Sequence, residues 1–189
     1  DGTKVAVELC AAANALGFPP DTGGIHMPET DREGLLETLR PAEDGGVLDR
    51  TGAIDSVTPT GDNPSAFVVT EAKNEATQAY LSQRYNIETA SNGRYQLFHR
   101  PYHLPQETIV SVAMAGLYGH ATGTVTEQTT DVVAAAKREL EPGETIVGGG
   151  GDTIYGRLQD ADTAAAADLV PFELLAGAAP DLFQGVLER

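Results

Sequence analysis

Apolar residues near the start of the chain recur with the spacing of a helix. Val5, Leu9, Ala13 and Leu16 follow a period of about 3.6 residues. Gly17 and the pair Pro19-Pro20 follow directly and cannot continue a helix. The pattern predicts a helix over residues 3–16. Further on, Thr30 and Glu33 have the spacing of a capping box ahead of Leu35, Leu36 and Leu39, which predicts a short second helix.

The middle of the chain mixes strand-like and helix-like patterns. Strands are expected where β-branched and apolar residues alternate between turn residues, and helices where the apolar period is 3.6. The expected strands are residues 53–57, 66–69 and 94–98, and the expected helices are 71–85 and 107–117. After Gly123 only short β-like segments remain, at 131–136, 145–147 and 153–155.

This order indicates an α/β (α+β) protein with two parts. Residues 1–125 are expected to form a mixed-sheet α/β domain. Residues 126–189 are expected to form a small β-rich module.

Composition and charge restrict the class of partner. With 41% hydrophobic residues, 189 residues can bury a substantial core. A formal charge of −16, with 28 Asp+Glu against 12 Lys+Arg, would repel nucleic acid and anionic membranes. The acidic residues are dispersed, as on the solvated surface of a halophilic protein. No apolar run approaches the roughly 20 residues of a membrane span. Cys10 is the single cysteine, so no internal disulfide is possible and a reducing, cytoplasmic location is expected.

The glycine-rich run does not have the spacing of a nucleotide-binding motif. Residues 148–156 contain no G-x-G-x-x-G, and Gly156 is followed by Arg157 where a P-loop would have Lys. A turn-rich linker is therefore favoured there. The chain begins at Asp1 and enters a helical pattern at once, so we expect it to be part of a longer polypeptide.

Two polar residues of the first predicted helix are candidates for function. Lys4 lies in the first turn, where the helix dipole slightly disfavours a cation, although pairing with Glu8 would explain it. Asn14 lies among apolar residues, and a buried amide needs partners. It could cap a neighbouring loop or contact a ligand, and the sequence leaves both open.

The segment 96–104 concentrates polar and cationic side chains after an apolar strand pattern. It contains His99, Arg100, Tyr102 and His103. In an extended segment, His99 and His103 would share one face and Arg100 and Tyr102 the other. These residues could form one buried and one solvated face, or an anion-binding Arg beside a proton-transferring His. No histidine has the spacing of a metal site, so no metal is expected.

Taken in order, several motifs resemble the homoserine-dehydrogenase-like NAD(P)-dependent oxidoreductases that end in a SAF domain, which include reductoisomerase-like enzymes of isoprenoid precursor synthesis. The most specific is Arg100-Pro101-Tyr102-His103-Leu104. The others are Asp1-Gly2-Thr3-Lys4, Ala13-Asn14-Ala15, Gly24-Ile25-His26, Gly45-Gly46-Val47-Leu48, Phe67-Val68-Val69 and residues 143–156.

The resemblance implies a central catalytic and dimerisation domain over residues 1–125 and an incomplete SAF-like module over residues 126–189, without the N-terminal Rossmann domain that would hold NAD or NADP. It implies that Lys4 and His103 are catalytic and that Asn14, His26, Arg100 and Tyr102 bind substrate. The expected substrate is a small anionic alcohol or carbonyl metabolite, and the expected assembly is a homo-oligomer.

Two other functions fit the sequence. The chain could be a non-catalytic ligand- or carbohydrate-binding protein that uses a groove in residues 131–175, or an inert dimerisation scaffold. A catalytic fragment instead predicts that Lys4, Arg100 and His103 converge.

Overall fold

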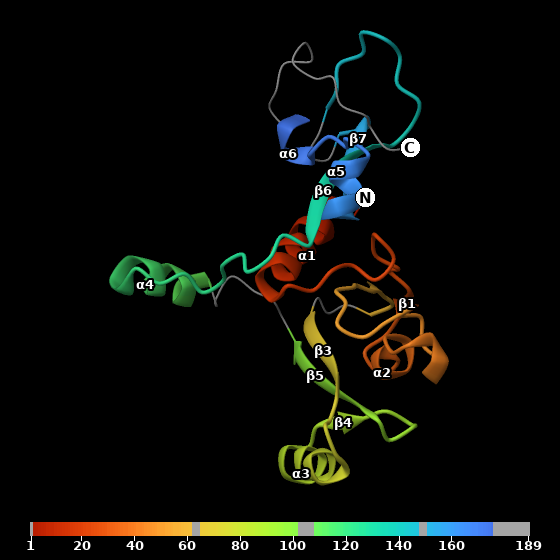
Figure 1. The fold of residues 1–189 in the computed structure, drawn as a ribbon, viewed down its shortest axis with the longest axis vertical. Coiled ribbons are helices and arrows are strands. Elements are labelled where there is room, and N and C mark those ends of the chain that lie inside the picture. The colour runs from red at the N-terminus through yellow and green to blue at the C-terminus, as the bar shows by residue number, and fades with distance from the viewer. Residues whose placement is uncertain (1, 62–64, 102–107, 148–150, 176–189) are drawn as a thin grey trace. The chain divides into compact units, whose positions relative to one another are not determined.

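A computed structural model describes residues 2–61, 65–101, 108–147 and 151–175. It divides the chain into two compact units (Figure 1). Unit 1 comprises residues 1–26, 52–56 and 123–189, and unit 2 comprises residues 27–51 and 57–122. Both helices and strands are present, which confirms the mixed α/β class. The sequence placed one domain boundary after residue 125, and the structure has a boundary between residues 122 and 123. The structure also groups the first 26 residues with the C-terminal segment, which the sequence did not indicate.

Unit 1 packs helices around a two-stranded antiparallel sheet. Strands β6 (Thr130–Ala136) and β7 (Ile154–Asp160) pair over their full length, with Ala134 opposite Gly156. Helix α1 (Thr3–Leu16) contributes Ala6 to the core that covers this sheet. Short helices α5 (Ala161–Ala166) and α6 (Phe172–Leu175) follow β7. The buried core residues of unit 1 are Ala6, Val132, Ala134, Ile154, Leu158, Val170, Phe172 and Leu175.

Helix α1 has the predicted bounds, and its end is set by Gly17. The φ of 68° at Gly17 is a left-handed conformation that glycine adopts without a Cβ clash, and its N–H bonds to the carbonyl of Ala13. The apolar period and the glycine stop were therefore sufficient to define this element.

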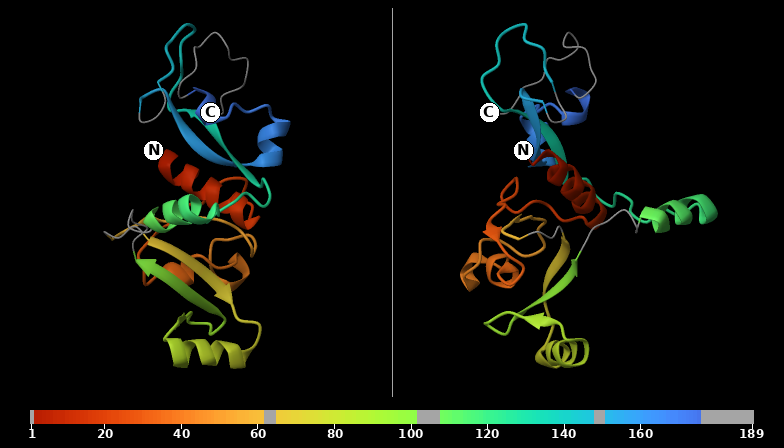
Figure 2. Two further views of the ribbon diagram at one scale, coloured as in Figure 1. Left: turned by 90° about the vertical axis from the view of Figure 1, so that its left-hand side faces the viewer. Right: turned by 180° about the vertical axis from the view of Figure 1, so that it is seen from behind.

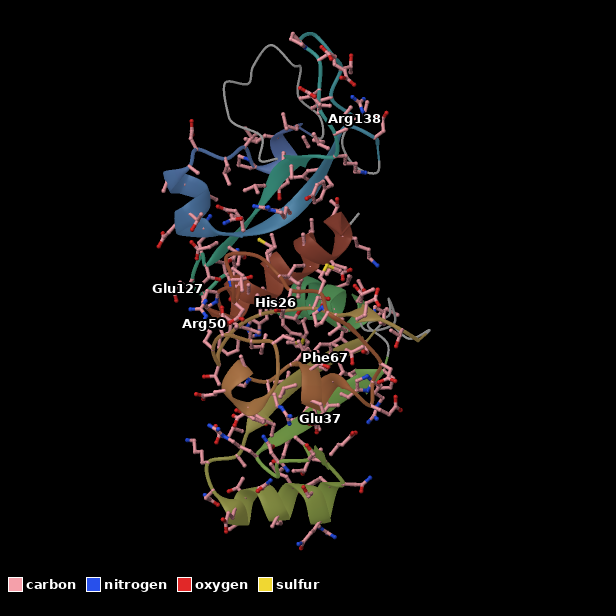
Figure 3. The ribbon with its side chains drawn as sticks, turned by 90° about the vertical axis from the view of Figure 1, so that its right-hand side faces the viewer. His26, Glu37, Arg50, Phe67, Glu127 and Arg138 are labelled. Atoms are coloured by element: carbon pink, nitrogen blue, oxygen red, sulfur yellow. The ribbon has the colours of Figure 1, made fainter. Side chains whose placement is uncertain are left out.

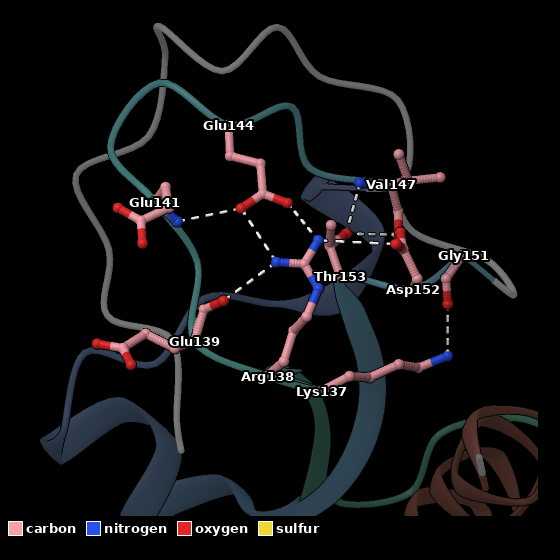
Figure 4. A network of polar contacts seen from close by, with 9 residues as sticks. All are labelled: Lys137, Arg138, Glu139, Glu141, Glu144, Val147, Gly151, Asp152 and Thr153. Carbon is pink, nitrogen blue, oxygen red and sulfur yellow. Dashed lines mark hydrogen bonds and ion pairs between the residues drawn. The ribbon is translucent and has the colours of Figure 1, made fainter.

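Side-chain hydrogen bonds and ion pairs connect residues of the segment between β6 and β7 (Figure 4). The Arg138 guanidinium pairs with Glu144 and lies 3.6 Å from Asp152. The hydroxyl of buried Thr153 bonds to both the N–H and the carbonyl of Val147, at 2.6 and 2.8 Å. The strand expected at residues 145–147 is therefore wrong, because a side chain takes the backbone bonds that a neighbouring strand would need.

Unit 2 contains a three-stranded antiparallel sheet in the order β3-β5-β4. Its strands are β3 (Ser65–Glu71), β5 (Tyr95–Pro101) and the short β4 (Glu88–Thr89). One face packs against helix α2 (Leu35–Thr38) through a core of Leu35, Leu36, Leu39, Ala90, Tyr95 and Leu97. A parallel pair, β1 (Glu29–Thr30) and β2 (Thr58–Pro59), and a 3₁₀ turn, η1 (Ala42–Asp44), complete this side.

Helix α3 (Glu75–Tyr85) covers one end of the opposite sheet face. Its N-terminus is capped by Asn74, whose side chain accepts from the Thr77 N–H. The fully buried Gln96 of β5 donates to the Gln78 carbonyl and to the Ser82 hydroxyl. Figure 2 shows β3 and β5 side by side, with β4 and α3 beyond them. Helix α4 (Thr108–Tyr118) follows β5 in sequence and contains no buried residue.

The strand expected at residues 53–57 does not form. Ile54 makes only an isolated bridge to Pro20, and a short strand begins at Thr58 instead. The Asp55 side chain accepts from the Ser56 N–H, a backbone group that a neighbouring strand would need, and it also accepts from the distant His26 N–H. In the part of the chain that the structure describes, no helix combines the length and the apolar character needed to cross a bilayer.

Candidate functional site

A hollow of about 360 Å³ in unit 2 lies where β3 begins and β5 ends. The volume is within the range of small-molecule sites, roughly 300–1,000 Å³. Its polar lining comes from the β1–α2 connection and from the ends of β3 and β5, and comprises Thr30, Asp31, Arg32, Glu33, Ser65 and His99. Leu35, Val57, Pro59 and Pro101 supply apolar walls.

Local hydrogen bonds position the β1–α2 side of this hollow. The Asp31 carboxylate accepts from the Gly34 N–H at 2.8 Å and so orders the turn before α2. Arg32 forms an ion pair with Glu88 at 2.9 Å. Both partners are well exposed, so the pair is worth about 0–1 kcal/mol and a ligand can compete for the guanidinium. The hollow therefore offers a cation, carboxylates, hydroxyls and an imidazole to a small polar molecule.

Arg100 lines a second, more apolar hollow on the sheet. Successive residues of a strand point to opposite faces. The hollow has a volume of about 350 Å³ and is lined by Ala66, Phe67, Val68, Ile87, Phe98, His99 and Arg100. Arg100 is paired in register with Ala66 and is exposed. The alternation of His99 and Arg100 expected from the sequence is thus present in β5, while Tyr102 and His103 lie outside the described residues.

Lys4 and Asn14 both lie on α1 in unit 1. The Lys4 side chain is 79% exposed, and its ammonium is 3.6 Å from Glu8, the pairing expected from the spacing. The Asn14 side chain joins α1 to the segment before β6. Its Oδ1 accepts from the N–H groups of Thr129 and Thr130 at 2.8 and 3.0 Å, and its Nδ2 donates to the Thr130 carbonyl at 3.1 Å. Asn14 thus caps a neighbouring segment, one of the two possibilities left open above.

His26, which is labelled in Figure 3, lies between two carboxylates whose side chains are almost fully buried. Its Nδ1 is 2.6 Å from Asp55, whose side chain is 5% exposed, and its Nε2 is 3.7 Å from Asp21, whose side chain is fully buried. The His26 N–H also donates to Asp55 at 3.1 Å. These contacts fix the orientation of the His26 ring. They also join residues 21–26 to residues 52–56, the two segments of unit 1 that precede and follow residues 27–51 in the sequence.

The candidate residues that the structure describes therefore have separate surroundings. Lys4 pairs with Glu8, Asn14 bonds to Thr129 and Thr130, His26 lies between Asp55 and Asp21, and Arg100 lines the apolar hollow. The first three belong to unit 1 and Arg100 to unit 2.

Sequence reasoning missed Asp21, Asp55 and the polar hollow. Asp55 and Ser56 interrupt the apolar residues of the segment 53–57, and that break in the pattern was a usable signal for a buried, bonded carboxylate. Glu33 was recognised only as part of a helix start. Nothing in the sequence indicated that the ends of β3 and β5 would meet the β1–α2 connection, because that contact depends on the tertiary fold.

The described residues do not fit a dinucleotide. A pyrophosphate is normally held by a parallel strand, a glycine-rich turn and a helix N-terminus. Among the described strands, the parallel ladder is the two-residue pair β1–β2, and no G-x-G-x-x-G occurs in the sequence. Within the described ranges, no group of three or more His, Cys, Asp or Glu is arranged to hold a metal ion.

Comparison with known families identifies the larger part of the chain. Residues 1–107 match the family model described as "Oxidoreductase DRL, catalytic domain". This range contains α1, His26, the whole β3-β5-β4 sheet and the linings of both hollows. No curated protein matches the chain. The chain therefore belongs to the oxidoreductase DRL catalytic-domain family.

Proposed function

We propose that this chain is the catalytic part of a homoserine-dehydrogenase-like, NAD(P)-dependent oxidoreductase that acts on a small anionic alcohol or carbonyl compound. The observation that carries the proposal is the family match over residues 1–107. Hollows of small-molecule size within the matched range support it, and Arg100 lines one of them.

The nicotinamide nucleotide would be held by a Rossmann domain elsewhere in the same polypeptide. The resemblance of the chain to the catalytic and SAF-like parts of such enzymes, and the match of residues 1–107 to a catalytic domain, support this division of labour. Isothermal titration of NAD or NADP into the 189-residue chain is expected to show no saturable binding. Micromolar binding of either nucleotide would contradict the division. We assign the C-terminal segment as the SAF-like module and the assembly as a homo-oligomer.

In this proposal the chain's own residues bind the substrate and move a proton. Carbonyl reduction leaves negative charge on the substrate oxygen, which a nearby cation stabilises and protonates. Lys4 suits that role, since its weak surface pair with Glu8 leaves the ammonium able to change partners. His103 is the second candidate acid. Arg100, with Tyr102, would hold the anionic end of the substrate through a bidentate pair. Asn14 and His26 would orient the substrate.

The test requires the full-length polypeptide with its nucleotide-binding domain and a panel of hydroxy acids, keto acids and sugar phosphates. Arg100→Lys keeps the charge but loses the planar fork, so KM should rise while kcat is retained. Lys4→Met and His103→Gln should lower kcat by about 10²–10⁴-fold.

Arg84→Lys is the matched control for Arg100→Lys. Arg84 is an exposed arginine of α3 and lines neither hollow. Its replacement should leave both kinetic constants unchanged. Circular dichroism confirms that each variant is folded. Unchanged turnover and KM in all three site variants would refute the assignment of these residues.

A further inference from the structure

Asn92 and Gly93 lie at the tip of an exposed turn between β4 and β5. The Gly93 N–H donates to the Ala90 carbonyl at 2.9 Å and closes the turn. Gly93 has a φ of 70°, in the left-handed region that glycine favours. Residues 91–94 are all exposed. Water therefore reaches the Asn92 amide and the backbone that follows it, and the function proposed above gives this turn no role.

The Asn92 carboxamide is placed to react with the backbone nitrogen of Gly93. Attack of that nitrogen on Cγ of Asn92 closes a five-membered ring, and glycine has no Cβ to obstruct the approach. The Asn92 Oδ1 accepts from the Arg94 N–H at 3.0 Å. Because Arg94 follows Gly93, this bond folds the carboxamide back along the Gly93 peptide unit. The same N–H stabilises the negative charge that develops on Oδ1 during the attack.

Each of the other four asparagines of the sequence has a feature that slows the same reaction. Asn63 precedes a proline, whose nitrogen carries no hydrogen to lose. Asn86 precedes an isoleucine, whose branched side chain crowds the nitrogen that would attack. Asn14 and Asn74 precede helical residues, whose fixed backbone dihedrals resist ring closure. The sequence and the turn therefore single out Asn92.

We propose that Asn92 is a site of spontaneous deamidation. The Gly93 nitrogen loses its proton and attacks Cγ of Asn92, the new N–Cγ bond closes a succinimide ring, and the amide nitrogen leaves as ammonia with that proton. Water then opens the ring at either carbonyl. Opening at Cγ gives aspartate, and opening at the main-chain carbonyl gives isoaspartate, in which the chain continues through the former side chain. Water is the only other reactant, and the reaction does not depend on the oxidoreductase chemistry proposed above.

Isoaspartate lengthens the backbone of the turn by one carbon. The length of a hairpin connection fixes the register of its strands, and the register here pairs Thr89 with Gln96. The turn also holds α3, because Gln78 Nε2 donates to the Gly93 carbonyl and Gln96 Nε2 donates to the Gln78 carbonyl. Isoaspartate therefore loosens β4 and α3, whereas aspartate leaves the length of the backbone unchanged.

The first test follows the reaction in the folded 189-residue chain, incubated at neutral and at mildly alkaline pH. Cleavage after Arg84 and Arg94 gives one peptide that contains both Asn86 and Asn92, so mass spectrometry compares the two in the same molecule. Digestion in heavy-oxygen water marks any deamidation that occurs during digestion itself. Asn92 should convert to the acid, and faster at the higher pH because the attacking nitrogen must lose a proton, while Asn86 stays an amide. Equal rates at Asn86 and Asn92, or no conversion of either, would overturn the proposal.

The second test asks whether isoaspartate loosens the fold. Chains that gained a negative charge are isolated by ion exchange, and their isoaspartate content is measured with an isoaspartyl methyltransferase. Asn92→Asp is the matched control, since it has the same added charge and an unchanged backbone length. Hydrogen exchange in α3 should be about five- to thirtyfold faster in the isoaspartyl chain, the factor expected from the loss of one or two hydrogen bonds, and unchanged in Asn92→Asp. Equal exchange in the isoaspartyl chain and in Asn92→Asp would overturn the effect proposed for the lengthened turn.

Discussion

Asn14 illustrates how one side chain can join two segments that are far apart in sequence. Its carboxamide satisfies the N–H groups of Thr129 and Thr130 and the carbonyl of Thr130. Asn14→Ala removes the acceptor of the Thr129 and Thr130 N–H groups and leaves the Thr130 carbonyl with only the weak thiol donor of Cys10, and Thr130 is fully buried. We expect the free energy of unfolding to fall by about 1–3 kcal/mol, measured by urea denaturation. Asn92→Ala, at an exposed turn where the side chain accepts from the Arg94 N–H, is the control. Equal stability of Asn14→Ala and the parent chain would show that Asn14 does not hold this junction.

Tyr95 allows a residue-level test by pH. Burial, with the hydrogen bond to Asp44 as the next cause, raises the pKa of Tyr95 to about 12. The unfolded phenol ionises near pH 10. The buried neutral phenol therefore stabilises the fold fully below about pH 10, and this contribution is lost as pH rises towards 12. Absorbance titration should show a tyrosine step near pH 12 that is missing in Tyr95→Phe. If Tyr95→Phe instead removed a tyrosine step near pH 10, burial would not raise the pKa of Tyr95.

At the scale of elements, the packing of α1 on the β6–β7 sheet depends on a close approach at Gly156. A Cβ added there would lie 2.8 Å from Val132 Cγ1 and 3.1 Å from Thr3 Cγ2. Gly156→Ala should therefore destabilise the fold by about 1–3 kcal/mol through overpacking, as measured by urea denaturation. Gly123→Ala is the matched control, since nothing lies within 4 Å of its added Cβ. A neutral Gly156→Ala would mean that α1 can move away from the sheet at little cost.

Elements were predictable from the sequence where one local pattern determined them. The bounds of α1 follow from its apolar period and Gly17, and α4 was expected within one residue of its observed limits. Strands failed where a side chain took the backbone bonds, as Asp55 does near residue 54 and Thr153 does at Val147. The polar hollow and the carboxylates around His26 depend on contacts distant in sequence, which no period reveals. Asn14 was the exception, because an amide in an apolar helix implied a partner.

At the scale of the whole molecule, two charge effects respond to salt in opposite directions. Ion pairs such as Arg94 with Glu71 and Arg32 with Glu88 weaken when screened. Mutual repulsion among the acidic residues weakens as well, which stabilises the compact state. With 28 Asp+Glu and only 12 Lys+Arg, at least 16 carboxylates have no cation to pair with one to one. Exposed pairs are individually worth about 0–1 kcal/mol, so relief of the repulsion should exceed their loss.

The melting temperature should therefore rise from low salt to molar KCl, where the Debye length falls to about 3 Å. Thermal melts at several protein concentrations separate this effect from self-association, because only association makes the midpoint depend on protein concentration. A midpoint that stays flat or falls with KCl at every protein concentration would mean that the ion pairs outweigh the repulsion among the 16 excess negative charges. The acidic surface would then not be an adaptation to salt.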